Sequence, residues 1–313
     1  MARWDITEYS IMKKISLLLT AILFTAAFSS CSLFGDKDGE YSPKEQISRK
    51  YYDEGEGKTL SQVWNWNDKQ LQSIDHYSYS GSISWTEDFS YNKKGQIERV
   101  DDYANRECTE YTYDGNKLSK ATYYYKGSIE YELTFMYDGN KISKIEYMEL
   151  GKRRNNRMFK EGFSPLNLLL PEKSLEKLHT ILNRATDSRE YVTVELTWEK
   201  DNVSKIEVFE GGFRATYSFK FDDKLNPYTG FFSLYPEESI IEDLSLNKNN
   251  PTQLMYTESE DGDTYSETVR YSYTYDGKFP TVQRMTFTES YEDWSTGEII
   301  TETWTVSTFY EYK

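Results

Sequence analysis

An eight-residue segment that occurs twice constrains the fold more than any other feature of this chain. The first copy, YDGNKLSK, covers residues 113–120, and the second, YDGNKISK, covers residues 137–144. Asp-Gly and Gly-Asn pairs tolerate the positive φ angles that two-residue hairpin loops require. Alternating apolar residues flank both copies, which is a strong hairpin signal. Each copy therefore predicts the end of one β-strand, a tight turn and the start of the next strand.

The polar residues of these two turns are Asp114, Asn116, Asp138 and Asn140. In the first turn, either Asp-Gly or Gly-Asn can occupy the two central positions, and a longer loop with a bulge is also compatible with the pattern. Turn preference alone explains the Asp and Asn residues. We therefore interpret them as turn formers rather than as metal or ligand contacts.

Aromatic residues that stand before turn signals repeat along the chain at a regular interval. The gaps between them are 25, 22, 24, 61, 23 and 54 residues. A unit of 22–25 residues is one hairpin with its reverse turn. The pattern indicates a degenerate tandem repeat, and its two long gaps contain insertions at residues 153–190 and 226–250. The seven aromatic residues are Trp66, Tyr91, Tyr113, Tyr137, Trp198, Phe221 and Tyr275.

From residue 59 onward the chain has the pattern of about fifteen consecutive strands joined mostly by short turns. Short connections require antiparallel pairing of neighbouring strands, and a sheet with so many strands must curl, split or close. Closure removes the exposed edges that promote aggregation. We therefore predict an all-β fold, an antiparallel β-meander of tandem hairpins that is strongly curved or closed into a barrel. It forms a single domain over residues 59–313.

One or two short helical insertions are expected in this domain. Residues 174–183 place Leu175, Leu178 and Ile181 on one helical face. Residues 237–244 lie between prolines and have room for one or two helical turns. Both segments fall in the insertions, where the hairpin repeat is interrupted.

The alternation in the strands fits a membrane-spanning barrel and also a barrel in water, because both place different residue types on their two faces. The mean hydropathy of −0.78 favours water. The polar positions of the strands are densely charged, and charged side chains that face lipid cost free energy. We therefore expect a barrel or sheet that is anchored at the membrane rather than embedded in it.

Residues 1–30 have the pattern of a secretory signal peptide. Met12, Lys13 and Lys14 form a short basic segment, and residues 15–28 form an apolar stretch of suitable length. This stretch is too short for a comfortable membrane span. Residues 1–11 are unlike the start of a signal peptide, so Met12 is expected to be the true start.

The residues Ser29, Ser30 and Cys31 resemble the lipobox of bacterial lipoproteins, with Phe28 where leucine is usual. The resemblance implies that Cys31 is diacylated and becomes the N-terminus after cleavage. Two acyl chains hold a protein on a membrane without a spanning segment. A plain signal peptide with an incidental cysteine and an uncleaved anchor remain alternatives.

Residues 31–58 are polar and charged, and most of the segment lacks aliphatic side chains. This composition predicts a lipidated flexible tether. Acidic residues shortly after Cys31 resemble the signals that export some lipoproteins to the cell surface. We therefore expect an outer-membrane, lipid-anchored protein on the periplasmic face or on the cell surface.

The formal net charge of −15 limits the possible partners. A surface this acidic repels phosphate backbones, which argues against nucleic acid and favours neutral or cationic partners. The two cysteines are Cys31 and Cys108. If Cys31 is acylated, they form neither a disulfide framework nor a cysteine metal site.

No motif for catalysis, a cofactor or a metal stands out. His76 and His179 are the two histidines, and a Gly-x-Ser-x-Gly motif is absent, so both histidines are interpreted as structural. The 52 Asp and Glu residues leave a paired-carboxylate glycan hydrolase open as an alternative. Residues 258–263 are interpreted as an acidic hairpin turn, because they lack the full spacing of a calcium loop.

Aromatic residues in the strands are the remaining candidates for ligand contact. Tyr and Trp stack on sugar faces and anchor protein interfaces. Alternation at period two predicts instead that they form the core face, and we favour that interpretation. The candidate residues are Tyr123, Tyr124, Tyr125, Tyr271, Tyr273 and Trp294.

The segment that begins at Tyr137 is similar to the tyrosine-aspartate (YD) repeats of rearrangement-hotspot and teneurin-type proteins, which build β-shells. The mature chain resembles a family of uncharacterised secreted lipoproteins of Gram-negative gut anaerobes, a domain of unknown function with a porin-like fold. The resemblance implies a curved or closed antiparallel meander, and it brings no activity and no catalytic residues. It rests on Cys31, the Trp64-Asn65-Trp66 strand, the YDGN hairpins, and residues 226–230 and 246–252.

Three hypotheses for the function follow. The first is a non-enzymatic, lipid-anchored binding or interaction module of the cell envelope, whose ligand is a glycan, a peptide or another envelope protein. The second is a glycan hydrolase that uses paired carboxylates. The third is a purely structural envelope protein. None of the three requires a cofactor.

Overall fold

The computed structural model describes the chain from residue 37 onward, with several gaps. Predictions that fall elsewhere lie outside the described residues; they concern the signal peptide, Cys31, the helix at residues 174–183, His179 and Trp294. The described ranges are 37–150, 192–210, 213–241, 244–260, 263–292 and 299–313.

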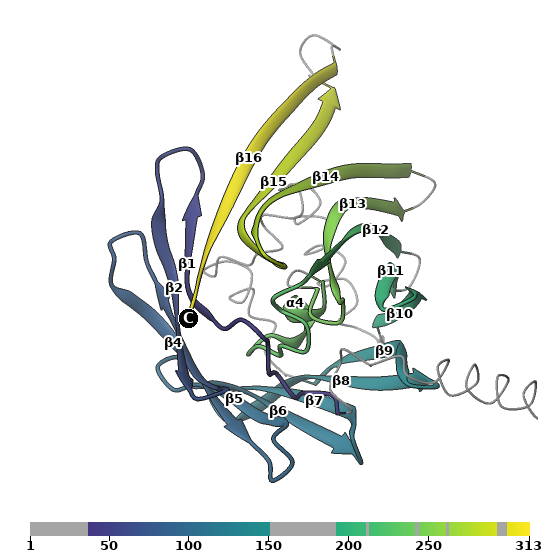
Figure 1. The fold of residues 1–313 in the computed structure, drawn as a ribbon. Helices are drawn as coiled ribbons and strands as arrows, with labels where there is room; N and C mark the ends of the chain where they lie inside the picture. Colours follow the sequence, from purple (N-terminus) through teal and green to yellow (C-terminus); the bar gives the residue numbers. More distant parts are fainter. Residues whose placement is uncertain (1–36, 151–191, 211–212, 242–243, 261–262, 293–298) are drawn as a thin grey trace, which may run out of the picture. The chain divides into compact units, whose positions relative to one another are not determined.

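The described residues contain sixteen strands that form one closed antiparallel barrel. Each strand pairs with its neighbours in the sequence, and β1 pairs with β16 to close the ring (Figure 1). The predicted antiparallel meander and its closure are confirmed. The strands are β1 (Ile47–Asp53), β2 (Thr59–Asn67), β3 (Gln70–Tyr77), β4 (Ile83–Tyr91), β5 (Ile97–Asp102), β6 (Glu107–Asp114), β7 (Lys117–Tyr125), β8 (Ser128–Asp138), β9 (Lys141–Glu149), β10 (Val192–Glu199), β11 (Asn202–Glu210), β12 (Phe213–Leu225), β13 (Asn249–Glu260), β14 (Asp263–Asp276), β15 (Phe279–Glu292) and β16 (Ile299–Tyr312).

The barrel begins earlier than the predicted boundary at residue 59. β1 lies within the segment predicted to be a flexible tether, and it pairs with both β2 and β16. Ahead of β1, the Asp38 carboxylate accepts hydrogen bonds from the Leu118 backbone amide at 2.9 Å and the Tyr137 hydroxyl at 2.5 Å. The tether prediction is therefore wrong for residues 37–58. It relied on the lack of aliphatic residues, whereas backbone, tyrosine and carboxylate groups hold this segment on the barrel.

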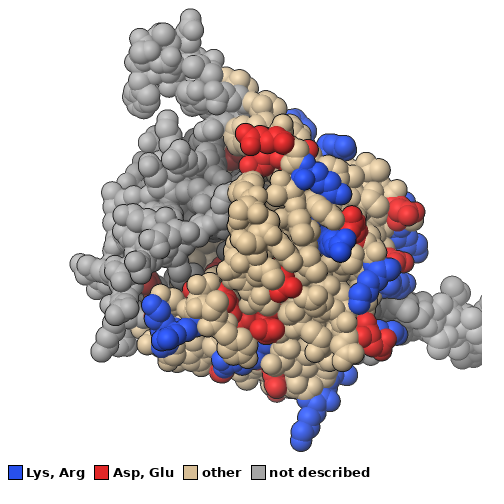
Figure 2. Space-filling view, turned by 90° about the vertical axis from the view of Figure 1, so that its left-hand side faces the viewer, with Lys and Arg blue, Asp and Glu red and all other residues tan. Residues whose placement is uncertain are grey.

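The two faces of the barrel wall differ in chemistry. Residues that point into the lumen are mostly apolar and buried, such as Leu71 at 0% exposure. Outward residues are mostly polar and form ion pairs across neighbouring positions, including Lys120 with Glu132 at 2.8 Å and Lys144 with Glu146 at 2.9 Å. Figure 2 shows lysine and arginine interspersed with acidic residues on the described surface in view. This arrangement is the reverse of a membrane-spanning barrel, whose outward face carries an apolar band.

The connection between β12 and β13 lies inside the ring of strands (Figure 1). We call its described residues, 226–241 and 244–248, the plug. The plug includes α4 (Pro236–Ile241), which falls in the predicted helical insertion. The described residues contain no helix with the length and apolarity needed to cross a membrane.

The plug provides much of the material that fills the lumen. Phe231 packs on Trp64 with ring centroids 5.2 Å apart, and Phe232 stacks on Tyr111 at 5.3 Å. Leu234 is completely buried between the plug and the wall. Apolar contact with the inward strand faces therefore explains why the plug lies in the lumen rather than on the surface.

All seven aromatic residues of the predicted repeat stand at β-bulges. A bulge sets two residues of one strand against one residue of its partner, and it redirects the side chains that follow. The register shifts at Tyr113 in the pairing of β6 with β7 and at Tyr137 in the pairing of β8 with β9. The same shift occurs at Trp66, Tyr91, Trp198, Phe221 and Tyr275.

The polar groups of these aromatic residues tie each hairpin to the one before it. In five cases the hydroxyl or indole N–H donates to a backbone carbonyl near the start of the preceding strand, over 2.5–2.9 Å. A buried Tyr or Trp needs such a partner for its polar group, so the repeat has a structural explanation. The bonds run from Trp66 to Ile47, Tyr91 to Leu71, Tyr113 to Ile97, Tyr137 to Leu118 and Trp198 to Ile142.

Candidate functional site

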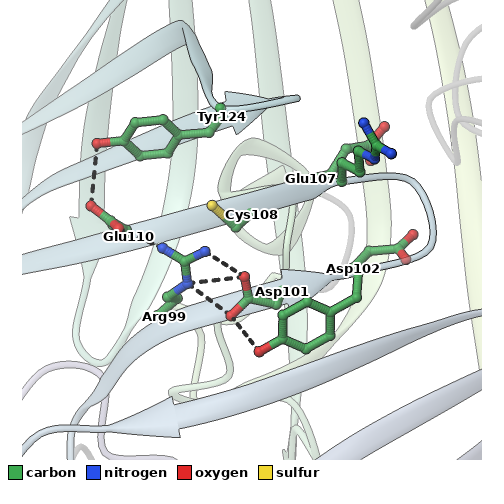
Figure 3. A pocket seen from close by; sticks show the side chains of 10 residues that line it. Arg99, Asp101, Asp102, Glu107, Cys108, Glu110 and Tyr124 are labelled. Carbon is green, nitrogen blue, oxygen red and sulfur yellow. Dashed lines mark hydrogen bonds and ion pairs between the residues drawn. The ribbon is translucent and has the colours of Figure 1, made fainter.

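A recess of about 430 Å³ lies on the outer wall of β5, β6 and β7, beside the loops that join β5 to β6 and β7 to β8. Figure 3 shows charged side chains of β5 and β6 gathered there, with Tyr124 of β7 at one side. The recess is lined by Arg99, Asp101, Asp102, Tyr103, Arg106, Glu107, Cys108, Glu110, Tyr124 and Gly127.

Arg99 organises the polar groups of this recess. Its guanidinium donates to both carboxylate oxygens of Asp101 at 2.6–2.9 Å and to Glu110 at 2.6 Å. Arg99 and Asp101 share one face of β5 because they are two residues apart, and Glu110 stands opposite Arg99 on β6. The Tyr124 hydroxyl donates to the second oxygen of Glu110 at 3.2 Å. The hydrogen bonds to Asp101 raise the pKa of Arg99, so the guanidinium stays charged.

Carboxylates outnumber the arginines in and around the recess. Asp88 of β4 stands opposite Asp101, and burial together with the charges of Asp101, Asp75 and Asp102 raises the pKa of Asp88. Asp102 accepts a hydrogen bond from the Ala104 backbone amide at 2.9 Å and so fixes the loop after β5. The resulting negative potential disfavours anionic ligands.

Cys108 lines the recess as a buried, free thiol. Burial raises the pKa of this thiol and outweighs the opposite influence of Arg99. A protonated thiol is a weak nucleophile and a poor metal ligand. The chemistry of the recess therefore rests on its carboxylates, guanidinium groups and tyrosines.

A second group of carboxylates lies inside the barrel, where the plug meets the wall. The Glu87 carboxylate accepts a hydrogen bond from the Leu234 backbone amide of the plug at 3.2 Å. Its other oxygen lies 2.9 Å from His76 Nε2, and the His76 ring stacks on Trp85 with centroids 3.6 Å apart. His76 thus positions a carboxylate that holds the plug.

Two further carboxylates fix the start of α4. The Tyr235 hydroxyl donates to Glu107 at 2.6 Å, and the Tyr131 hydroxyl donates to the two oxygens of Glu237 at 2.8 and 3.0 Å. Burial is the main factor that raises the pKa of Glu107, and it raises the pKa of Glu237 to about 7. These groups attach the plug to the wall, and Glu107 also lines the recess.

The protein is expected to be more stable at pH 5 than at pH 8 because of Glu237. Its pKa is raised from 4.5 to about 7, so the folded state binds this proton more tightly than the unfolded state. The stabilisation is complete below the unfolded pKa and is lost as the pH rises through about 7. It amounts to about 2 kcal/mol after allowance for the part of the residue that contacts solvent.

Glu237→Gln is expected to remove most of this pH dependence, because the amide keeps an acceptor for Tyr131 and does not titrate. Urea unfolding at pH 5 and pH 8 measures the effect. Glu146→Gln on the outer wall is the control and should retain the wild-type pH dependence. Identical pH dependence in wild type and Glu237→Gln would refute the assignment.

The turn residues lie where the sequence predicts. Asp114 pairs with Lys117 and Asp138 pairs with Lys141, so Gly-Asn holds the two central positions of each loop. The glycines have φ angles of +64° and +59°, the region that favours glycine. Of the alternatives, the two-residue Gly-Asn loop is present rather than a longer loop, and a bulge lies next to it in each strand pairing.

The aromatic candidates divide between the core and the outer wall. Tyr123 is completely buried, and its ring stacks on Tyr131 at 4.7 Å. Tyr271 packs against the core, and Tyr273, two residues further along β14, donates its hydroxyl to the Pro251 carbonyl at 2.8 Å. Tyr124 points outward into the recess. The core interpretation is therefore confirmed for Tyr123, whereas Tyr124 has access to a ligand.

The acidic segment at residues 258–263 joins β13 to β14, and Glu260 pairs with Asp263. Residues 261 and 262 lie outside the described chain. Among the described residues, no three His, Cys, Asp or Glu side chains are placed to hold a metal ion. The recess has no signature in the sequence, because Arg99, Asp101 and Glu110 resemble ordinary polar positions of strands until the register is known.

This chain resembles known proteins in its structure rather than in its sequence. No family model matches the sequence, and no curated protein matches it. The structure is similar to a porin-like protein from Bacteroides uniformis, with a TM-score of 0.51 and 14% sequence identity, covering 85% of this chain and 98% of that chain. A porin-like protein from Bacteroides vulgatus also matches, with a TM-score of 0.41, 10% identity and coverage of 86% and 99%. The likeness to the Bacteroides uniformis protein shows that this chain has a porin-like barrel fold.

Proposed function

We propose that this protein is a non-enzymatic binding or interaction module of the cell envelope, held on the outer membrane by acyl chains on Cys31. Its ligand is a glycan or a protein, and it faces the periplasm or the cell surface. One observation carries the proposal: the outward face of the barrel is charged, whereas the inward face is apolar and packs on the plug.

This distribution of charged side chains outside and apolar side chains inside limits the functions that the barrel can perform. A wall with ion pairs on its outside gains nothing from contact with lipid tails, so membrane attachment needs a separate anchor. The plug occupies the lumen between inward-facing residues such as Trp64 and Tyr111, so passage of solutes is not the favoured role. Ligand contact is left to the outer wall and to the loops.

A hydrolase with paired carboxylates is the weaker candidate. Such enzymes need one protonated carboxylic acid beside one ionised carboxylate, both open to the substrate. In the recess, Asp101 and Glu110 are both bound to Arg99, so the guanidinium already occupies the oxygens that a substrate would need. Glu107 and Glu237, whose pKa is raised, are bound to tyrosines where the plug meets the wall. Asp88, whose pKa is also raised, stands opposite Asp101 but does not line the recess.

Labelling cells with a palmitate analogue tests the anchor. The wild-type protein should carry the label and sediment with membranes, and Cys31→Ala should lose both properties. Cys108→Ala is the matched control and should remain labelled. Label on the Cys31→Ala protein would show that the lipoprotein assignment is wrong.

Binding is tested with the purified full-length protein on a glycan array and in a pull-down from envelope extract. Selective retention of a glycan or an envelope protein supports the module. If a correctly folded barrel retains no ligand in either assay, the proposed binding function is contradicted.

A further inference from the structure

We propose that the recess between β5, β6 and β7 binds a neutral saccharide. This inference rests on the proposed function and specifies its ligand class and its site. The volume of about 430 Å³ falls in the range of about 300–1,000 Å³ that small-molecule sites occupy. The recess opens on the outer wall, where a soluble ligand can reach it.

The aromatic part of the site is formed by Tyr103 and Tyr124. Tyr103 lies in the loop after β5 and is 70% exposed, so packing within the protein does not explain it. Its hydroxyl lies 3.4 Å from Asp101, which directs the side chain toward the recess. An exposed tyrosine ring beside a polar recess offers a flat apolar face to the C–H groups of a sugar ring.

The polar part of the site is already arranged before a ligand arrives. Arg99 holds Asp101 and Glu110 in place through charge-assisted hydrogen bonds of 2.6–2.9 Å. The Arg99 and Glu110 side chains remain 39% and 46% exposed, so they keep donors and acceptors that face solvent. Neighbouring hydroxyls of a sugar both donate and accept, and they match such carboxylate and guanidinium groups. Fixed partners also lower the entropy cost of binding.

Other ligand classes fit the recess less well. Its lining carries two arginines against four carboxylates, so an anionic ligand is repelled. A cation would compete with Arg99 for Asp101 and Glu110. An apolar ligand would remove these charged groups from water without replacing their hydrogen bonds, which is costly. A neutral molecule rich in hydroxyl groups satisfies the lining without these costs.

The test measures the affinity of the full-length protein for neutral gluco-, manno- and xylo-oligosaccharides by calorimetry. Binding is located by the rate at which Cys108 is alkylated, read from its peptide by mass spectrometry. An occupied recess should protect this thiol, because Cys108 lines it. Spermidine and galacturonate oligosaccharides serve as the cationic and anionic probes.

Two exposed tyrosines form a matched pair of variants. Tyr103→Ala should weaken binding of the neutral oligosaccharide about tenfold, since an aromatic contact is lost. Tyr103→Phe keeps the ring and should stay within about threefold of wild type. Tyr79 is 71% exposed on another loop and does not line the recess, so Tyr79→Ala should leave binding unchanged.

The proposal is overturned if no neutral oligosaccharide both binds and protects Cys108, or if only spermidine or galacturonate does so. Equal losses in Tyr103→Ala and Tyr79→Ala would also overturn it. These failures are distinct from failure of the proposed function. A protein partner in the pull-down together with an unprotected Cys108 would reject the saccharide site and leave the interaction module intact.

Discussion

A fragment that starts at residue 59 is expected to lose the closed barrel, whereas a fragment that starts at residue 37 keeps it. Without β1, the edges of β2 and β16 lose their partner together, and open edges promote aggregation. The shorter fragment also lacks Tyr41, which packs on Phe231 of the plug at 5.3 Å and donates to the Pro227 carbonyl at 2.9 Å. These combined losses are comparable with the whole stability of a domain, about 5–15 kcal/mol.

Size-exclusion chromatography and thermal unfolding in detergent-free buffer measure this effect. The fragment from residue 37 should elute as a compact species and unfold cooperatively, and the fragment from residue 59 should aggregate. A peptide of residues 37–58 added in trans should recover part of the folded signal. Equal melting temperatures for the two fragments would show that β1 is dispensable and that the tether prediction is correct after all.

Leu234→Ala is expected to destabilise the barrel by about 2–5 kcal/mol, the usual cost of truncating a buried leucine. Leu234 is 0% exposed and lies in the plug. Its carbonyl accepts a hydrogen bond from Thr109 of β6, and its amide donates to Glu87 of β4. The backbone is therefore fixed on two strands and cannot easily move to fill the cavity that the shorter side chain leaves.

The same substitution at an exposed leucine provides the control. Leu150 is 44% exposed and directly follows β9, so Leu150→Ala should change the free energy of unfolding by less than about 0.5 kcal/mol. Chemical denaturation of both variants measures the difference. Equal effects of the two substitutions would mean that the plug does not contribute to the core.

The hairpin architecture could be predicted from the sequence because its signals are local. The YDGN segments specify a two-residue loop through the positive φ of Gly115 and Gly139, and a meander with short turns permits only neighbour pairing. The aromatic repeat also corresponds to a structural feature, since Tyr113 and Tyr137 stand at β-bulges. Bulges follow from the turn next to them, so they have a local sequence signature.

The remaining features depend on contacts between residues far apart in the chain. Residues 37–46 are polar, and their position becomes evident once Asp38 meets Leu118 and Tyr137. The plug was expected only as an insertion with helical turns, because its place in the lumen depends on which strand faces point inward. The recess depends on the register that sets Arg99 opposite Glu110, and a single sequence does not give that register.

The proposed function requires that the charged face of the barrel contacts water while acyl chains on Cys31 alone contact the membrane. Ser272 is an exposed residue in the middle of β14 and points outward. A spin label at Ser272→Cys, in full-length protein with Cys108→Ser on liposomes, tests the claim most directly. Strong relaxation by a water-soluble nickel chelate and weak relaxation by oxygen dissolved in lipid are expected. Strong relaxation by oxygen and protection from the chelate would instead place this wall in the bilayer.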